Sequence, residues 1–414
     1  MKNSSKTLMV LGAGPFQVPG IRKAVALGHY VISVDDRPEN IGHRFAHRRV
    51  HCSTTRSEEL ARLAEELTID GICTFSSDVA VPSVGYVCDR LGLPGISARV
   101  AQLMSTKHCL REAQNSAGLP HPKFVVARLA EDLELVRRLS FPVIFKPVDS
   151  SGSRGVSQVN APSHEAIVGA FNLARSFSPS GTVCVEEFVP GREFGGDAVV
   201  IEGKCAFLGI TEKYIEGFVV MGHSYPSRLE LEDRQRIKAA IEASCNAVAY
   251  DCGPLNFDVK LDAERVTILE MSARTGGNGI PALLKRATGF DVEEATIRRA
   301  LEEPLLGDWH EDMQAPRGAA SLVFGSSRKG VMKGIASLAD LRAKVPEVAE
   351  LLVAAPIGAP VNPFQHNGNL IGCVVFDCAS LTQYAGIADR IREALNVELD
   401  DTAEDVSGMP ASAT

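Results

Sequence analysis

The chain has 414 residues, a formal net charge of −8, 23% charged residues and 45% hydrophobic residues. A chain of this length is expected to form two or three domains with a large buried core. The acidic balance disfavours a general nucleic-acid-binding surface, and no apolar run approaches the ~18 residues of a transmembrane helix. A local cationic pocket for a nucleotide remains compatible with this charge.

The ten cysteines are scattered along the chain, and none of them forms a C-x-x-C pair. Most lie in apolar runs, so we expect buried thiols in a reducing cytoplasm. The first residues hold only a short apolar run before glycines, which predicts a first strand and not a signal peptide. These features favour a cytoplasmic protein without a membrane or nucleic-acid partner.

Residues 7–105 alternate between strand-like and helix-like segments, which predicts a doubly wound parallel sheet. Within it, Gly12 and Gly14 follow the first strand and Asp35 ends the second, like half of a dinucleotide fingerprint. An NAD(P)-dependent oxidoreductase is therefore one alternative. Gln17 replaces the third glycine of that fingerprint, so turn and strand-end roles are the favoured interpretation of these residues.

Three histidines, His43, His47 and His51, are spaced four residues apart. On a helix this spacing would place them on one face, where a metal site could be imagined. The segment instead predicts a loop entering a strand, and no Cys or carboxylate completes a ligand set nearby. Solvated loop histidines are the favoured interpretation.

The segment 141–159 contains an apolar strand interrupted by Lys146, a loop of small residues at 149–155, and a second strand. A lysine on a strand before a Gly/Ser loop suits a polyphosphate, because the lysine neutralises oxygens and the loop backbone offers N–H donors. The P-loop pattern is absent, since no lysine follows the second glycine. An ordinary hairpin with a solvent-reaching lysine is the alternative.

Three further motifs follow in order, VCVEEFVPGREF at 183–194, LNFDVKL at 255–261 and VTILEMSARTGG at 266–277. Together with the lysine and its loop, they resemble the ATP-grasp superfamily, in particular carboxylate–amine ligases of the L-amino acid ligase and carbamoyl-phosphate synthase large-chain type. Each motif is weak alone, but four in order at family-like spacing are specific. The resemblance covers about residues 7–400.

The resemblance implies a fold with α/β and α+β parts. A Rossmann-like parallel sheet (the pre-ATP-grasp domain) would occupy 1–105, and an ATP-grasp domain 106–310, with a lid subdomain at about 123–190. An α+β module would follow at 311–402. The tail 403–414 is small, acidic and prolyl, and is expected to be disordered. Beyond the first sheet, we expect helices at 107–118, 131–139, 164–176, 231–250, 279–303, 338–344 and 381–395.

The resemblance assigns the phosphates of ATP to a cationic set. It implies that Lys107 and Lys146 neutralise phosphate oxygens, and that the loop residues Ser151, Gly152 and Arg154 close over them. A solvent-facing lysine and an exposed loop arginine are the alternatives for Lys107 and Arg154.

The same resemblance places adenine on the strand of Glu186, Glu187 and Val189, which would hold it largely through backbone groups. Glu193 matches the family's acceptor for the ribose hydroxyls, with a solvated strand-end carboxylate as the alternative. Lys213 matches a lysine that faces the γ-phosphate in many members, so it is a candidate catalytic residue. His223 could face the acceptor substrate or cap a strand end.

Asp258 and Glu270 lie on the two strands of one predicted hairpin. Two carboxylates that face each other repel unless a cation lies between them, so they predict a divalent metal site, and Mg²⁺ suits oxygen ligands. Ser272 stands where the family usually has Asn, and its hydroxyl is a shorter and weaker metal ligand. Arg274 matches the family's arginine, whose planar fork can hold a carboxylate or a developing acyl phosphate.

The implied reaction joins a carboxylate to an amine with Mg²⁺ and ATP as cofactors. The carboxylate would take the γ-phosphoryl group to give an acyl phosphate, and the amine would then displace phosphate. The partners are small molecules, with amino acids suggested by the family, which also contains many homodimers. Two further alternatives stay open: carboxylation with bicarbonate, and a non-catalytic ATP-binding module, which the loss of Asn at Ser272 favours slightly.

Overall fold

The computed structural model describes residues 5–305 and 318–400. The chain divides into two compact units, each assembled from three segments. Unit 1 contains Met1–Pro122, Val189–Ile210 and Arg228–Ala315, and unit 2 contains Lys123–Phe188, Thr211–Ser227 and Pro316–Thr414. The four-part division expected from the sequence stays a prediction, and the expected disordered tail 403–414 lies outside the described residues.

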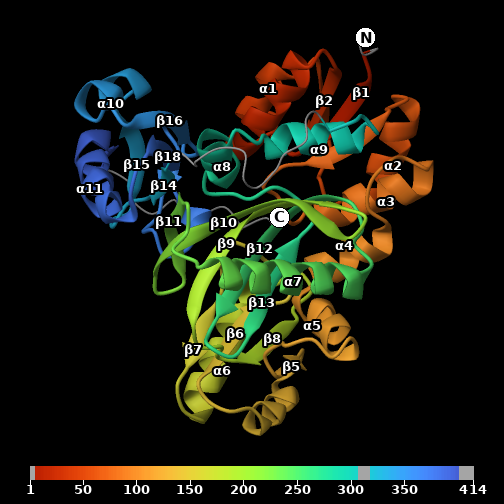
Figure 1. Ribbon diagram of the computed structural model, residues 1–414, viewed down its shortest axis with the longest axis vertical. Helices are drawn as coiled ribbons and strands as arrows, with labels where there is room; N and C mark the ends of the chain where they lie inside the picture. The colour runs from red at the N-terminus through yellow and green to blue at the C-terminus, as the bar shows by residue number, and fades with distance from the viewer. Residues whose placement is uncertain (1–4, 306–317, 401–414) are drawn as a thin grey trace. The chain divides into compact units, whose positions relative to one another are not determined.

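Unit 1 begins with the predicted parallel sheet, whose strand order is β3-β2-β1-β4. Strand β1 is apolar and buried along most of its length, because helices cover both faces of a parallel sheet. Helix α9 (Val292–Ala300) packs against α1 in this sheet's outer layer (Figure 1). The bounds are β1 Thr7–Leu11, α1 Val18–Ala26, β2 Tyr30–Asp35, β3 Arg48–His51, α2 Ser57–Glu66, β4 Gly71–Thr74 and α3 Val81–Leu91.

The second sheet of unit 1 has the order β13-β12-β9-β10, and it carries the predicted hairpin. Strand β12 alternates between buried and half-buried residues, so its apolar side chains face the core while Asn256, Asp258 and Lys260 share the other face. The bounds are β9 Arg192–Ile201, β10 Lys204–Glu216, β12 Gly253–Leu261 and β13 Val266–Ser272, with helices α4 Ala98–Ser105, α5 Lys107–Ser116 and α7 Leu231–Val248.

The segment 279–303, which was predicted to be helical, contains two helices. Helix α8 (Ile280–Thr288) ends at Gly289, whose φ of 80° is a left-handed conformation that glycine adopts at little cost. Helix α9 then begins after Asp291, whose side chain accepts a hydrogen bond from the Glu294 N–H. A glycine followed closely by an N-capping aspartate is the signal that divides the segment.

Unit 2 contains a four-stranded antiparallel sheet with the order β5-β8-β6-β7. Helix α6 (His164–Ser176) packs on it through a core that includes Phe145 and Phe171. The helix expected at 131–139 is a 3₁₀ helix, η3 (Ala130–Arg138), the tighter form that short connections adopt. The strands are β5 Phe124–Ala127, β6 Val143–Pro147, β7 Ser157–Val159 and β8 Val183–Glu187.

The remainder of unit 2 is an α+β module, and its main strands run in the order β10-β11-β14-β18-β16. Its core contains Phe376 and Tyr384, and the ring of Tyr384 stacks on Tyr214 at 3.7 Å. Helices α10 and α11 accompany these strands (Figure 1). The bounds are β11 Val219–Tyr225, β14 Ala319–Phe324, β15 Gly330–Gly334, α10 Leu338–Lys344, β16 Val348–Val353, β17 Pro360–Val361, β18 Gly372–Asp377, α11 Tyr384–Leu395 and β19 Glu398–Asp400.

The predicted mixture of α/β and α+β parts is therefore confirmed. All ten cysteines are free thiols, and eight of them are buried, as their apolar surroundings predicted. In the described ranges, no helix combines the length and the apolar character that crossing a membrane requires.

Candidate nucleotide and metal site

The predicted site residues are divided between the two units. Unit 1 holds the predicted metal ligands and the arginine, and unit 2 holds the predicted phosphate loop and its strand lysine. The unit 1 set is Lys107, Val189, Glu193, Asp258, Glu270, Ser272 and Arg274, and the unit 2 set is Lys146, Ser151, Gly152, Arg154, Glu186, Glu187 and Lys213.

Asp258 and Glu270 face each other on β12 and β13, as the hairpin predicted. Lys107, the first residue of α5, reaches the same place, with its Nζ 3.1 Å from Glu270 Oε1. The lysine is mostly buried and the carboxylate is about one-third exposed. The structure therefore brings one cation and two carboxylates from three different elements together.

These residues fit a magnesium ion that is shared with phosphates. In the parts of the chain that the structure describes, no group of three or more His, Cys, Asp or Glu could hold a metal alone. Magnesium is usually bound by one or two carboxylates plus substrate phosphates, which matches a pair. Ser272 lies two residues after Glu270, and its buried Oγ has no hydrogen-bond partner among the described residues. An orphaned oxygen at this position could serve as a further ligand.

Arg111 supports this strand from behind. It is almost fully buried on α5, and its guanidinium donates to the carbonyl oxygens of Ile268 and Leu269 at 3.1 and 2.5 Å. Arg111 therefore holds β13 at the two residues that precede Glu270. The sequence motifs did not include Arg111.

Arg274 is held by Asp78, which lies in the loop after β4. Arg274 Nε donates to Asp78 Oδ1 at 2.8 Å, and Nη2 donates to Asp78 Oδ2 at 2.9 Å. Burial would raise the pKa of Asp78, but the Arg274 charge and hydrogen bonds outweigh it and hold that pKa at about 2. Asp78 is a residue that the sequence analysis missed, although a Ser-Ser-Asp run at the carboxyl end of a parallel strand is a recognisable signal.

The glycine turn after Arg274 is fixed by Asp197 on β9, a second residue that was missed. Asp197 Oδ2 accepts from the Gly276 N–H and Oδ1 accepts from Asn256 Nδ2, both at 2.9 Å. Asp197 is fully buried, and burial raises its pKa to about 6 despite these hydrogen bonds. Ser76 Oγ donates to the Gly276 carbonyl at 2.6 Å. Backbone and side chains thus hold this turn on both sides.

Glu193, the predicted ribose acceptor, lies on β9 opposite Lys260 of β12. The Lys260 Nζ is 3.9 Å from Glu193 Oε2, and both side chains are mostly buried. The alternative of a solvated strand-end carboxylate therefore does not describe it. Val189, the predicted adenine contact, is also buried.

Lys146 and Glu186 form the polar centre of the four-stranded sheet in unit 2. They lie on the neighbouring strands β6 and β8, and their Nζ and Oε2 atoms are 2.5 Å apart. The two side chains are 12% and 3% exposed, so Lys146 is not the solvent-reaching lysine of an ordinary hairpin. Glu187 instead accepts a hydrogen bond from the Ser140 N–H at 2.8 Å.

The Gly/Ser loop follows β6 and is held in shape by other parts of unit 2. Gly152 and Gly155 have φ angles of 66° and 70°, the left-handed region that favours glycine. Its Gly152 carbonyl accepts from the Asn367 N–H at 3.0 Å, and Ser153 Oγ donates to the Phe218 carbonyl at 2.6 Å. Arg154 folds back onto the loop and donates to the Ser151 carbonyl at 3.0 Å. The loop is therefore a fixed backbone cradle.

Lys213 lies on β10 opposite His223 of β11. The histidine is fully buried, its Nδ1 is 2.9 Å from Thr211 Oγ1, and burial together with the Lys213 charge lowers its pKa to about 3. His223 is thus a neutral core histidine, so it neither caps a strand end nor changes charge near neutral pH.

The polar residues of the half fingerprint in the first sheet form hydrogen bonds with backbone groups. Asp35 accepts hydrogen bonds from the N–H groups of Ala13 at 2.7 Å and Arg37 at 2.9 Å. Gln17, at the third glycine position, donates to the Phe75 carbonyl at 2.6 Å. These contacts give Asp35 and Gln17 structural roles.

The interpretation of all three histidines as solvated is wrong for His43. It is buried, and its Nδ1 is 2.8 Å from Ser33 Oγ. His43 lies in the short 3₁₀ helix η2 (Ile41–Phe45), before β3. His47 stacks on Tyr30 and accepts from the Val31 N–H.

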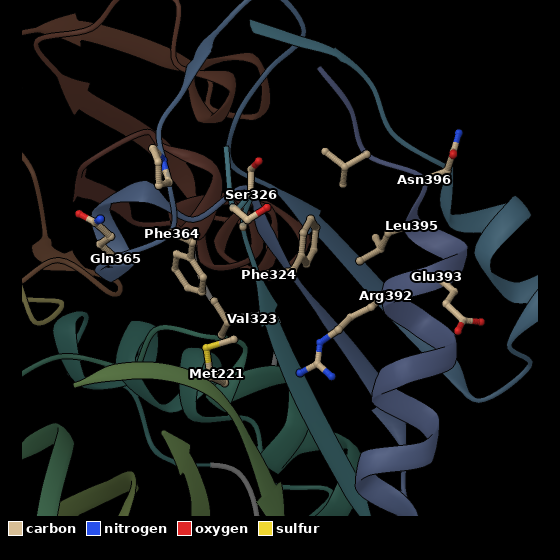
Figure 2. A pocket seen from close by; sticks show the side chains of 14 residues that line it. Met221, Val323, Phe324, Ser326, Phe364, Gln365, Arg392, Glu393, Leu395 and Asn396 are labelled. Carbon is tan, nitrogen blue, oxygen red and sulfur yellow. The ribbon is translucent and has the colours of Figure 1, made fainter. Parts of the chain in front are cut away.

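A pocket of 660 Å³ lies in unit 2, and none of the residues predicted for the site lines it. Figure 2 shows Met221, Val323 and Phe364 gathered on one side of it, with Arg392 and Glu393 projecting from α11. No local sequence pattern marks this pocket, because its lining comes from β11, β14, α11 and two loops.

Part of the chain matches a known family. Residues 139–282 match the family model of the ATP-grasp domain. The chain is 25% identical over 266 residues to the alanine–anticapsin ligase of Bacillus subtilis (strain 168), a match that covers 58% of this chain. The match spans 56% of that ligase, little more than half of its length.

Solved structures share the fold. An L-amino acid ligase from Bacillus licheniformis superposes with a TM-score of 0.81 at 21% identity, covering 96% of this chain and 99% of that one. The biotin carboxylase domain of 2-oxoglutarate carboxylase from Hydrogenobacter thermophilus superposes with a TM-score of 0.74 at 18% identity, covering 95% and 90%. That structure holds MgADP and bicarbonate.

Proposed function

We propose that this chain, an ATP-grasp protein, is an ADP-forming ligase that joins a small carboxylate to an amine. The observation that carries the proposal is the Asp258–Glu270 pair on β12 and β13, with Lys107 3.1 Å from Glu270. This arrangement in a chain with a matched ATP-grasp domain suits a magnesium–nucleotide complex.

Each set contains residues that are predicted to contact the nucleotide. Lys146 and the backbone of the Gly/Ser loop would neutralise and cradle the phosphates, while the strand at Glu186–Val189 would contact adenine. Glu193 would accept the ribose hydroxyls. Asp258 and Glu270, with Ser272, would hold Mg²⁺, which when bound neutralises phosphate charge and orients the γ-phosphoryl group.

The chemistry would use two displacements. An oxygen of the substrate carboxylate attacks the γ-phosphorus, and ADP leaves with the electron pair of the broken P–O bond, which gives an acyl phosphate. The amine then attacks the acyl carbon, phosphate leaves and a proton is released, which gives the amide. Arg274 would stabilise the negative charge on the activated carboxylate, and Lys213 would face the transferred phosphoryl group.

The names of two similar proteins support amino acids as substrates, since one is an alanine–anticapsin ligase and the other an L-amino acid ligase. The bicarbonate-containing neighbour supports carboxylation as a variant of the same chemistry. An oxidoreductase is less well supported, because the Asp35 carboxylate already accepts two backbone hydrogen bonds.

ADP formation from Mg·ATP tests the proposal, measured with a matrix of amino-acid pairs and small carboxylates and with mass spectrometry of each positive mixture. We expect ADP that depends on both substrates and a product whose mass is their sum minus water. Glu270→Ala should abolish this product, whereas Glu264→Ala, in the exposed turn of the same hairpin, should not. ADP formation with bicarbonate alone would favour carboxylation. If the protein binds ATP but forms no ADP with any substrate, the non-catalytic ATP-binding module remains as the interpretation.

A further inference from the structure

We propose that Asp78 is a positioning residue for Arg274. It would grip one edge of the guanidinium so that the opposite edge is presented to the substrate carboxylate or the acyl phosphate. The inference rests on the proposed function, because that function places the activated carboxylate against Arg274. Asp78 itself would touch neither substrate nor nucleotide.

The hydrogen bonds of Arg274 determine which edge of its guanidinium remains for a substrate. A guanidinium has five N–H donors in one plane. Nε and Nη2 donate to the two oxygens of Asp78, and Nη1 donates to the Thr275 carbonyl at 2.9 Å. Among the described residues these three bonds leave one donor on each terminal nitrogen. Nη1 and Nη2 form the end of the guanidinium opposite Nε, and this end can bind a carboxylate with two hydrogen bonds.

The position of Asp78 is itself fixed by the chain around it. Phe75 pairs with Thr275 as an isolated parallel bridge, and Ser76 donates to the Gly276 carbonyl. Ser76 has a φ of 52°, an unusual conformation for a residue other than glycine. The loop that follows β4 is therefore tied to 274–276 through backbone, hydroxyl and carboxylate contacts, so the orientation of Asp78 is transmitted to Arg274.

Burial strengthens the hydrogen bonds between Arg274 and Asp78. The Arg274 and Asp78 side chains are 10% and 18% exposed, so little water competes for their hydrogen bonds. A buried guanidinium without a counter-ion would be costly and would move toward solvent, so removal of the carboxylate should displace it. Ser272 Oγ and Thr275 Oγ1 are buried and have no hydrogen-bond partner in the described structure, which leaves two hydroxyls beside Arg274 for a polar ligand.

A first test needs no substrate and uses the full chain with Asp78→Asn and Asp78→Glu. Phenylglyoxal modifies accessible guanidinium groups, and peptide mass spectrometry reports the rate at Arg274. We expect several-fold faster modification in Asp78→Asn and an intermediate rate in Asp78→Glu, with the dissociation constant of Mg·ADP unchanged. An unchanged rate at Arg274 in both variants would overturn the proposal.

A second test separates positioning from stability with a matched ion pair. Glu294 of α9 holds Arg298 through Nε and Nη2 at 2.9 and 2.8 Å, and it is similarly buried. With a substrate pair found by ADP formation, Asp78→Asn should raise the KM of the carboxylate at least about tenfold and that of ATP less than about twofold. Glu294→Gln should change neither KM, although it lowers the melting temperature.

Equal effects of Asp78→Asn and Glu294→Gln on the carboxylate KM would overturn positioning and leave a structural ion pair. If the wild type forms no ADP with any pair, the proposed function fails. The phenylglyoxal rate at Arg274 still decides whether Asp78 holds the guanidinium, so the two failures are distinguishable.

Discussion

Lys146 Nζ and Glu186 Oε2 are 2.5 Å apart across the neighbouring strands β6 and β8, and both side chains are nearly buried. Such a pair is costly to desolvate, and breaking it by removing one partner leaves a buried charge behind. Lys146 lies on β6, the strand that leads directly into the Gly/Ser loop. We propose that this charge binds the phosphates of a nucleotide, because a buried ion pair adds little stability.

Substitution of Lys146 separates these two roles. Lys146→Met should lower the free energy of unfolding by about 3 kcal/mol, because the buried Glu186 carboxylate loses its lysine. The double variant Lys146→Met/Glu186→Gln should regain most of that stability. Both variants should bind Mg·ATP at least about tenfold more weakly by calorimetry. Wild-type affinity in the double variant would show that Lys146 does not contact phosphate.

The shape of the Gly/Ser loop is tested at Gly155. A Cβ at this position would lie 2.9 Å from a ring carbon of Phe177, and the φ of 70° is already unfavourable for alanine. Gly155→Ala should therefore distort the loop and weaken Mg·ATP binding several-fold. Gly217→Ala is the matched control, since its φ is 61° and nothing lies within 4 Å of its Cβ. Equal ATP affinity in the two variants would contradict a role for the loop.

Several of these elements were predictable because their signals are local. The predicted hairpin corresponds to β12 and β13, and their register places Asp258 opposite Glu270 as expected. The small residues of 149–155 predicted a loop, and the structure gives Gly152 and Gly155 positive φ angles. In each case neighbouring residues carry the information, and turn chemistry limits the alternatives.

The supporting residues could not be found in this way. Asp78 meets Arg274 across 196 positions of the sequence, and Asp197 meets Gly276 across 79. No periodicity or spacing reports a contact over such separations, because the fold of unit 1 creates it. The roles of the nucleotide and metal residues stay predictions, because a motif identifies a residue but not the ligand that it binds.

The magnesium dependence of ADP formation tests the carboxylate pair. Glu270→Gln should raise the magnesium concentration needed for half-maximal ADP formation, because it removes one charged ligand. Ser272→Asn should lower it, since a carboxamide oxygen reaches farther than the Ser272 hydroxyl. Glu264→Gln, in the exposed turn of the same hairpin, is the control. An unchanged magnesium dependence in Glu270→Gln would place the metal elsewhere.

Asp197 predicts a pH-dependent stability. Burial raises its folded pKa to about 6, above the ordinary value of 3.8, so the folded state binds the proton more tightly. Stability from this group is therefore present below about pH 4 and is lost as the pH rises to about 6, by about 3 kcal/mol in all. Asp197→Asn lacks this dependence.

Urea unfolding of the two proteins at several pH values between about 4.5 and 7 measures the effect. The stability of the wild type relative to Asp197→Asn should fall as the pH rises through this window and then become constant. A difference that is independent of pH, or one that grows with pH, would show that Asp197 is not held with a raised pKa.

The central claim is the transfer of the γ-phosphoryl group to a carboxylate. It is tested most directly with a carboxylate substrate labelled with ¹⁸O, taken from any pair that supports ADP formation. An acyl phosphate intermediate predicts that one labelled oxygen leaves the carboxylate and is recovered in inorganic phosphate. Label in AMP, or phosphate without label while the amide forms, would contradict the account.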